Sequence, residues 1–228
     1  LATLYLRIYF CGMPFFMSNK EETMMNEPRQ NYYEKRALRL LPKLRERHFE
    51  AYYCRTGEEA LQQALKLIPE GVTVGWGGAL SAQQIGLMDA LHAGNYSVID
   101  RDKTNTPEQR KAAMKQCLLA DVFITGANAL SMDGQMVNID GMGNRVAAIV
   151  YGPESVIVIA GMNKVVDTLE DAVRRARTVA APVNKQRFPG DTPCLVTGVC
   201  GDCKSENSIC NQILITRNSR PAGRIKII

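Results

Sequence analysis

Short apolar runs alternate with longer amphipathic stretches along most of this chain. The runs are bounded by glycine, proline or polar residues, a pattern typical of strands buried within a sheet. We expect strands at 49–54, 72–75, 96–100, 121–125 and 155–160. The amphipathic stretches predict helices at 21–47, 56–68, 81–92, 106–119, 143–151 and 167–181.

Strands that recur between helices indicate βαβ units. We therefore predict an α/β fold with three layers, in which an open, mostly parallel, Rossmann-like sheet carries helices on both faces. Asp133-Gly134 predicts a hairpin within 131–138, and Thr56 with Glu59 forms a capping box. Prolines lack an amide donor and should bend or end the helices that contain them, at Pro28, Pro42 and Pro182.

Three predicted strands end in turns rich in glycine and polar residues, and ligands of open parallel sheets bind at such strand ends. Glycine lets the backbone approach a ligand, and the amides that open the next helix favour an anion. Ordinary βα and hairpin turns are the alternative, because the glycine spacing of nucleotide-binding loops is absent. The candidate ligand-binding residues are Gly75, Gly77, Gly78, Ser81, Gly126, Asn128, Asp133, Asn138, Asn144, Gly161, Asn163 and Lys164.

No Ser/His/Asp or Cys/His arrangement is recognisable, so the sequence assigns no catalytic residue. Asp140 has the chemistry of a general base, although a loop aspartate is more often a helix cap or solvated. His92 lies at the end of a predicted helix, where charge complementarity explains it.

Four of the seven cysteines lie close together near the end of the chain, at Cys194, Cys200, Cys203 and Cys210. Four thiolates can enclose a zinc ion or an iron–sulfur cluster, and we favour this interpretation. The spacing C-x5-C-x2-C-x6-C matches neither bacterial ferredoxins nor zinc ribbons. Redox-active thiols or disulfides, and inert buried thiols, are the alternatives.

Length and charge limit the number of domains and the classes of function that the chain can have. A chain of 228 residues accommodates one sizeable α/β domain. The net charge of +5 is spread along the chain without a dense basic stripe, which argues against nucleic-acid binding. Residues 1–16 are apolar, but Arg7 interrupts them and they are too short to span a bilayer. We expect Met17 to be the natural start, with 1–16 as upstream or non-native sequence.

Several segments together resemble the lactate-utilisation (LUD) domain family. They are ADVFITGANALSMDG at 120–134, Val137-Asn138, GNRV at 143–146, YGP at 151–153, VIAGMNK at 158–164, and AAPVN at 180–184 followed by the cysteine-rich tail. The last segment is similar to a cysteine-tailed branch of the family. The resemblance extends over roughly Asn31 to Ile228.

The resemblance implies a fold related to sugar-phosphate isomerases, glucosamine-phosphate deaminases and CoA transferases. It also implies a bacterial or archaeal cytoplasmic protein connected with the oxidation of L-lactate to pyruvate, acting beside iron–sulfur or cysteine-rich partner subunits. We expect residues 17–48 to form a helical region and 49–228 the LUD-like domain, including the cysteine-rich segment 194–210. A homo-oligomer that binds a small anion and does not contact a membrane is a further expectation.

Three functions follow from these observations. The first is an accessory or redox component of 2-hydroxy acid utilisation, with a metal or iron–sulfur centre on the four cysteines. The alternative is a binding domain or enzyme for sugar phosphates or CoA esters, in which the cysteines hold structural zinc. The third is a scaffold or regulatory subunit whose activity appears only in a complex.

Overall fold

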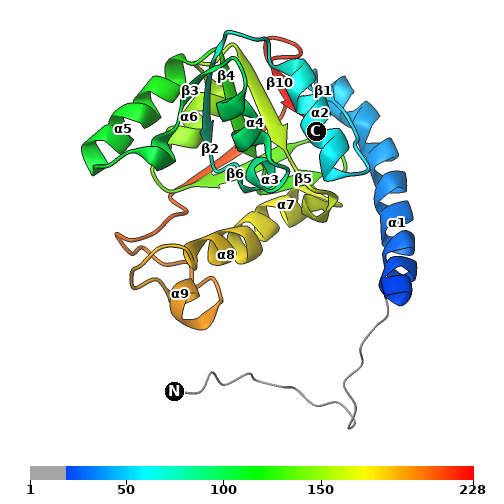
Figure 1. Cartoon of the computed structure of the whole chain (residues 1–228). Coiled ribbons are helices and arrows are strands. Elements are labelled where there is room, and N and C mark those ends of the chain that lie inside the picture. The colour runs from blue at the N-terminus through cyan, green and yellow to red at the C-terminus, as the bar shows by residue number, and fades with distance from the viewer. Residues whose placement is uncertain (1–18) are drawn as a thin grey trace.

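Six parallel strands form the main sheet of the protein (Figure 1). The computed structural model describes residues 19–228. The strands are β1 (Glu50–Ala51), β2 (Thr73–Gly77), β3 (Ser97–Ile99), β4 (Val122–Gly126), β7 (Ser155–Ile159) and β10 (Ile225–Ile227). Their order is β1-β10-β7-β4-β2-β3, which places the last strand of the chain between β1 and β7. The predicted parallel α/β sheet is confirmed.

Helices cover both faces of this sheet, as predicted. They are α1 (Asn19–Glu46), α2 (Gly57–Leu67), α3 (Leu80–Gln84), α4 (Leu87–Ala93), α5 (Pro107–Gln116) and α6 (Asn144–Val150). Neighbouring residues of a strand point to opposite faces. Phe123 of β4 therefore packs in one core with Leu44 of α1 and Ile149 of α6. Ile124 packs in a second core, with Leu87 of α4.

A second, four-stranded sheet lies beside the first. Its order is β8 (Val165–Val166), β5 (Ala129–Ser131), β6 (Met136–Asp140) and β9 (Gln212–Thr216). β5 and β6 form the predicted hairpin, but the sequence did not predict β8 or β9. Helix α7 (Leu169–Arg175) covers this sheet by packing Ala172 against Val137 and Ile139. A π-helical turn (Ala176–Ala180), α8 (Ala181–Lys185) and α9 (Pro193–Thr197) follow.

Three helix boundaries differ from the prediction. Helix α1 continues through Pro28 and Pro42, and its buried face, which includes Leu40, offsets the cost of the missing amides. The helix expected at 81–92 is divided into α3 and α4 by Gly86, whose φ is 79°. Pro182 is expected to end a helix, but it lies in the first turn of α8. A π-helical turn precedes it, and the wider hydrogen-bond spacing of that turn accommodates a residue without an amide donor.

Within residues 19–228, no helix is both long and apolar enough to cross a lipid bilayer. The expectation that residues 1–16 are upstream sequence lies outside the described residues.

Candidate functional site

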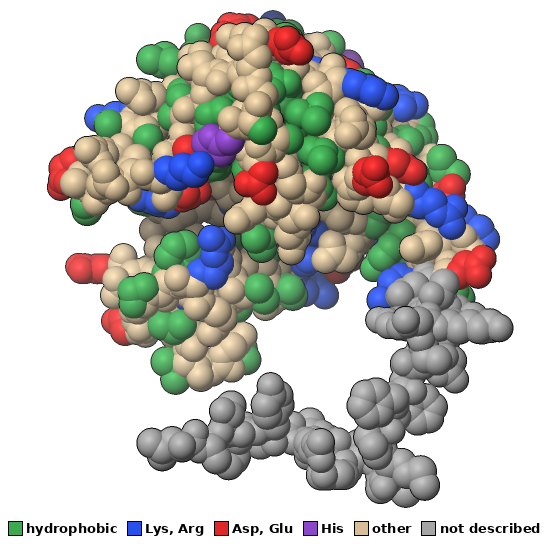
Figure 2. Space-filling view, viewed as in Figure 1, with side chains coloured by type: hydrophobic (Ala, Val, Ile, Leu, Met, Phe, Trp, Pro, Cys, Tyr) green, Lys and Arg blue, Asp and Glu red, His purple; other side chains and the backbone are tan. Residues whose placement is uncertain are grey.

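A large cavity follows the carboxyl edge of the main sheet. Its volume is about 1060 Å³. The segments that follow all six parallel strands contribute to its wall, and residues of α1, α7 and α8 contribute from other sides. Figure 2 shows the surface hollowed between the lobe that carries α8 and α9 and the body that carries the main sheet. The cavity therefore lies where open parallel sheets bind their ligands.

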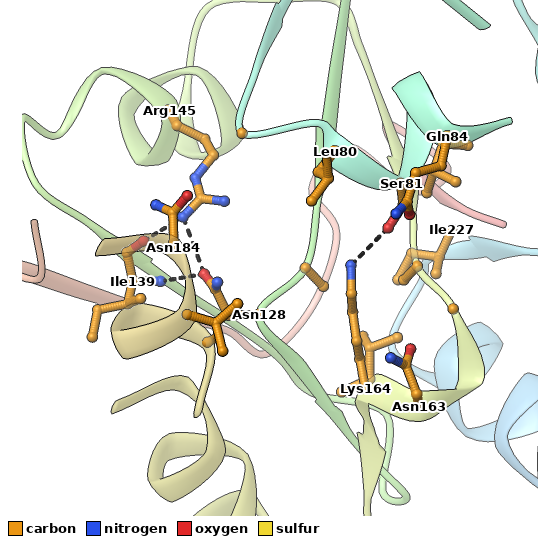
Figure 3. A pocket seen from close by; sticks show the side chains of 18 of the residues that line it. Leu80, Ser81, Gln84, Asn128, Ile139, Arg145, Asn163, Lys164, Asn184 and Ile227 are labelled. Carbon is orange, nitrogen blue, oxygen red and sulfur yellow. Dashed lines mark hydrogen bonds between the residues drawn. The ribbon is translucent and has the colours of Figure 1, made fainter. Parts of the chain in front are cut away.

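Lys164 and Ser81 meet inside this cavity (Figure 3). Nζ of Lys164 donates a hydrogen bond of 2.8 Å to Oγ of Ser81. Ser81 belongs to α3, and Lys164 ends a short 3-10 turn (Met162–Lys164) after β7. Burial lowers the pKa of Lys164 from its ordinary value of 10.5 to about 8, and the charges of Arg175 and Arg145 act in the same direction. A substantial fraction of this amine is therefore neutral slightly above neutral pH.

Arg145 lies across the cavity from Lys164 (Figure 3). Its Nε is 3.4 Å from Oδ2 of Asp140, and its Nη2 donates to Oδ1 of Asn128 at 3.0 Å. Burial lowers the pKa of Arg145, whereas the Asp140 carboxylate opposes that shift. Asp140 also accepts hydrogen bonds from two amides of the turn that precedes α6, those of Met142 and Gly143. Asp140 thus orients Arg145 and holds the turn that leads into the helix that carries it.

Gly78 makes room for Arg145. Its φ of +61° lies in the left-handed region, which glycine adopts most readily. A methyl group at this position would lie 2.6 Å from Nη1 and 2.9 Å from Cδ of Arg145, so this side chain would have to move. Both the backbone and the neighbouring guanidinium therefore favour glycine here.

Two further arginines bring positive charge to the cavity. Arg175 of α7 donates from Nη1 to the main-chain oxygen of Asn128 and forms no ion pair with a described residue. Arg101 follows β3, and its buried Nε has no hydrogen-bond partner. Burial lowers the pKa of both guanidinium groups. Arg145 has the Asp140 carboxylate at 3.4 Å, and Arg101 has the Asp102 carboxylate at 4.0 Å, which Arg110 shares at 2.8 Å. Lys164 and Arg175 have no ion pair with a described residue, so this part of the wall carries an excess of positive charge that suits a carboxylate or a phosphate.

The structure brings together most of the polar residues predicted at strand ends. Seven of the candidates line the cavity: Gly78, Ser81, Asn128, Asn144, Gly161, Asn163 and Lys164. The other five do not line it. Gly75 and Gly77 lie within β2, where a methyl group on Gly75 would meet Sγ of Cys117 at 2.7 Å. Gly126 ends β4, and its oxygen accepts a 2.8 Å hydrogen bond from Nδ2 of the buried Asn138.

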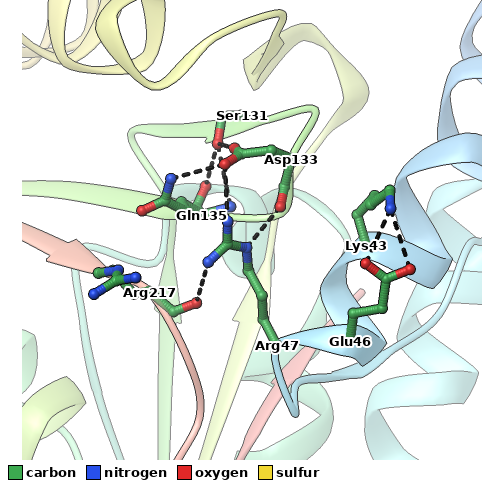
Figure 4. A network of polar contacts seen from close by, with 7 residues as sticks. All are labelled: Lys43, Glu46, Arg47, Ser131, Asp133, Gln135 and Arg217. Carbon is green, nitrogen blue, oxygen red and sulfur yellow. Dashed lines mark hydrogen bonds and ion pairs between the residues drawn. The ribbon is translucent and has the colours of Figure 1, made fainter.

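Asp133 lies in the β5–β6 turn, in a network that joins this hairpin to the end of α1 (Figure 4). Its carboxylate accepts hydrogen bonds from Ser131, from Nε2 of Gln135 at 2.8 Å and from Nη2 of Arg47 at 2.9 Å. Burial would raise the pKa of Asp133, but these hydrogen bonds and the charge of Arg47 outweigh it and hold the pKa below its ordinary value. The interactions present account for Asp133 without a ligand.

Sequence reasoning missed the arginines of the cavity, which include Arg101, Arg145 and Arg175. Arg101 directly follows a predicted strand, so the strand-end argument that selected Lys164 would have found it. Arg145 belongs to α6, which packs against the main sheet, and Arg175 belongs to α7, which covers the second sheet. No local signal shows that either side chain reaches the carboxyl edge of the main sheet. Lys185, which is 1% exposed, was also missed. It donates to the main-chain oxygens of Pro189 and Asn207 and fixes the loop that carries the cysteines.

Cys194, Cys200, Cys203 and Cys210 all line one small cavity of about 70 Å³ beneath α8. All four residues are half-buried, and the six described cysteines are free thiols. Sγ of Cys210 lies 3.2 Å from Oγ of Ser208, and Sγ of Cys194 lies 3.5 Å from Oγ1 of Thr192. In residues 19–228, no group of three or more Cys, His, Asp or Glu side chains is arranged to hold a metal ion. The structure thus gathers four soft donors around one hollow without closing a coordination shell.

The fold and the cavity define an α/β domain with a cationic cavity at the carboxyl edge of a parallel sheet. A family model described as the LUD domain matches residues 38–228, and the chain therefore belongs to the LUD domain family. This confirms the resemblance found in the sequence.

Several solved structures are similar to the chain, two of which illustrate the range. One is a DUF162 family protein from Deinococcus radiodurans, with 13% identity, a TM-score of 0.49, and coverage of 86% of this chain and 96% of that one. The other is ribose 5-phosphate isomerase A from Neisseria gonorrhoeae, with 21% identity, a TM-score of 0.33, and coverage of 50% and 56%. No curated protein matches the chain.

Proposed function

We propose that this LUD-domain protein binds a small 2-hydroxy acid anion of the lactate class and takes part in its oxidation in the cytoplasm. One observation carries the proposal. Lys164 and Arg175 reach the same cavity, and neither forms an ion pair with a carboxylate of a described residue. Arg101 also reaches it, with only the Asp102 carboxylate at 4.0 Å from its Nε. A bound carboxylate would supply the missing negative charge.

The arrangement around Lys164 suits a hydroxy acid in particular. A carboxylate can accept hydrogen bonds from the ammonium or guanidinium groups, while the substrate hydroxyl can pair with Ser81 or with Asn163. As the neutral amine, Lys164 can accept a proton from that hydroxyl, because its lowered pKa of about 8 suits a general base. These residues would bind and orient the substrate and receive its proton.

Oxidation also needs an electron acceptor, and we assign that part of the proposal to the cysteine cluster or to a partner subunit. Four thiol donors around one hollow are the donor set that an iron–sulfur cluster or zinc requires. Cys194, Cys200, Cys203 and Cys210 would hold it, and an iron–sulfur cluster would supply one-electron transfer there. Ile139 and Ala181 line both this hollow and the large cavity, so only a thin wall separates the two sites.

Ligand-dependent stabilisation tests the binding site. Thermal unfolding of the full chain should shift upward with L-lactate, D-lactate or pyruvate, because a ligand that binds only the folded state stabilises it. Lys164→Gln should reduce the shift, whereas Lys66→Gln, at an exposed position on α2, should retain it. Equal shifts in the two variants would contradict the assignment of Lys164, and no shift with any small carboxylate would overturn the binding proposal.

Elemental analysis tests the cysteine centre. Protein purified without oxygen should contain iron and absorb visible light, and a Cys200→Ser, Cys203→Ser variant should lose both properties. Cys54→Ser, which removes a thiol outside the cluster, is the matched control. Zinc without iron would leave electron transfer to a partner subunit, and the absence of both metals after reconstitution would reject the centre.

The size of the cavity favours a second candidate function. A volume of about 1060 Å³ exceeds what a three-carbon acid needs and lies at the upper end for drug-sized ligands. A sugar phosphate or CoA ester would fill it better, with the phosphate near the arginines and structural zinc on the cysteines. The same thermal-unfolding experiment decides between the two, since the alternative predicts larger shifts with ribose 5-phosphate or acetyl-CoA than with lactate.

A further inference from the structure

Lys164, which is half-buried, differs from Lys185, a buried lysine of the same cavity wall. Lys185 is 1% exposed, and its ammonium donates to two main-chain oxygens at 2.8 and 3.0 Å. Those carbonyl groups stabilise its charged form. Nζ of Lys164 has only the hydroxyl of Ser81 as a hydrogen-bond partner among the described residues, and a hydroxyl can accept from an ammonium or donate to a neutral amine.

The surroundings of Lys164 favour the neutral amine. Burial is the largest contribution to its lowered pKa, followed by the positive charges of Arg175 and Arg145. A desolvated lysine beside other cations is the arrangement that turns an amine into a nucleophile towards carbonyl carbon. The same arginines can hold an anionic group of the molecule that carries the carbonyl.

We infer that Lys164 forms a Schiff base with a small 2-oxo acid bound in this cavity, and that Ser81 passes the protons of the reaction. The inference rests on the proposed function, because it uses the same anion site. It goes further because it gives Lys164 a covalent role and names a second ligand, the 2-oxo acid that forms when the hydroxy acid is oxidised.

The step balances without an oxidant. The lone pair of the neutral Nζ forms a bond to the ketone carbon, and the C=O π electrons move to oxygen, which takes up through Oγ of Ser81 a proton that Nζ releases. Oγ of Ser81 then donates its own proton to the hydroxyl group of the carbinolamine, and the nitrogen lone pair expels water. The nitrogen returns its last proton to Oγ of Ser81. A carbon–nitrogen double bond remains, so the net change is amine plus ketone to imine plus water.

Reductive trapping tests the inference. The full chain is incubated with pyruvate and sodium cyanoborohydride, digested and mapped by mass spectrometry. We expect one reduced pyruvate adduct per chain, on the peptide that contains Lys164, and we expect L-lactate to slow its formation because it occupies the site and has no ketone. Lys164→Arg keeps the charge but cannot form the imine, and it should lose the adduct, while Lys66→Arg should keep it. Ser81→Ala should form the adduct at least several-fold more slowly.

The outcomes separate this inference from the proposed function. A pyruvate-dependent thermal shift without an adduct on Lys164 would overturn the Schiff base and leave the binding site intact. An adduct spread over exposed lysines, unaffected by lactate, would overturn it as well. The absence of both shift and adduct would reject the anion site itself. Peptide mapping of the chain without any substitution identifies the lysine that carries the adduct, so the test does not depend on whether a variant folds.

Discussion

Replacing Lys164 by methionine should change how the stability of the protein depends on pH. The pKa of this lysine falls from 10.5 to about 8 on folding, which corresponds to about 3 kcal/mol at about 1.36 kcal/mol per pKa unit. The side chain keeps some contact with solvent, so screening should reduce the observable effect to about 1–3 kcal/mol.

The sign follows from proton binding. Below pH 8 both the folded and the unfolded chain carry a protonated Lys164, and the folded state bears the full cost of burying that charge. Between pH 8 and 10.5 the unfolded chain binds more protons than the folded chain, so stability rises with pH. Lys164→Met has no such group, and its stability relative to the natural chain should therefore fall as pH rises through this window.

Urea unfolding measures the effect. The free energy of unfolding of both proteins is determined at several values from pH 7 to pH 10.5, and one is subtracted from the other. Tyrosines, cysteines and other lysines also titrate there, but they are common to both chains and cancel in the difference. Lys66→Met, at an exposed position, should give a flat difference. A flat difference for Lys164→Met, or a slope of the opposite sign, would refute the reasoning.

Three further substitutions test other parts of the argument. Gly78→Ala should lower the free energy of unfolding by about 1–2 kcal/mol because of the positive φ at this position, and it should abolish the thermal shift with anions because it displaces Arg145. Gly71→Ala is the control: Gly71 has a φ of +80° and nothing within 4 Å of an added methyl group, so this variant should lose stability but keep the thermal shift. Arg145→Met should lower stability by about 3–5 kcal/mol in urea unfolding, because it leaves Asp140 buried without its partner, and adding Asp140→Asn should restore part of the loss. Thr56→Ala removes the hydroxyl that accepts from the amide of Glu59 at 3.1 Å, and should cost about 1 kcal/mol by thermal unfolding.

The main sheet could be predicted because its strands carry their own signal. β4 and β7 are continuous apolar runs, which is what burial on both faces of a parallel sheet requires. β8 and β9 could not be recognised in the same way. β8 has only two residues, and most of β9 is exposed, since it pairs with β6 at the edge of the second sheet. The short apolar run at 213–215, with two β-branched isoleucines, was the available signal.

The candidate site could be predicted only in part, for a related reason. The strand-end rule selects residues by their position along a strand, and it found Ser81, Asn128 and Lys164. It also selected Gly75, which instead allows close packing against Cys117. The positions of Arg145 and Arg175, on the other side of the cavity, depend on how the second sheet packs against the first. The contacts that determine this packing join residues far apart in the sequence, so no local pattern reveals them.

Asn128 shows how the two sheets produce one site. It follows β4 of the main sheet, yet its Oδ1 accepts hydrogen bonds from the amide of Ile139 in β6 and from Arg145, and its main-chain oxygen accepts from Arg175. The same residue therefore joins the edge of the first sheet to the second sheet and to α6 and α7. An anion held between Lys164 and these arginines would be held by both sheets at once. Ligand binding should therefore stabilise the packing of one sheet on the other, and the positive charges left close together in its absence should weaken that packing.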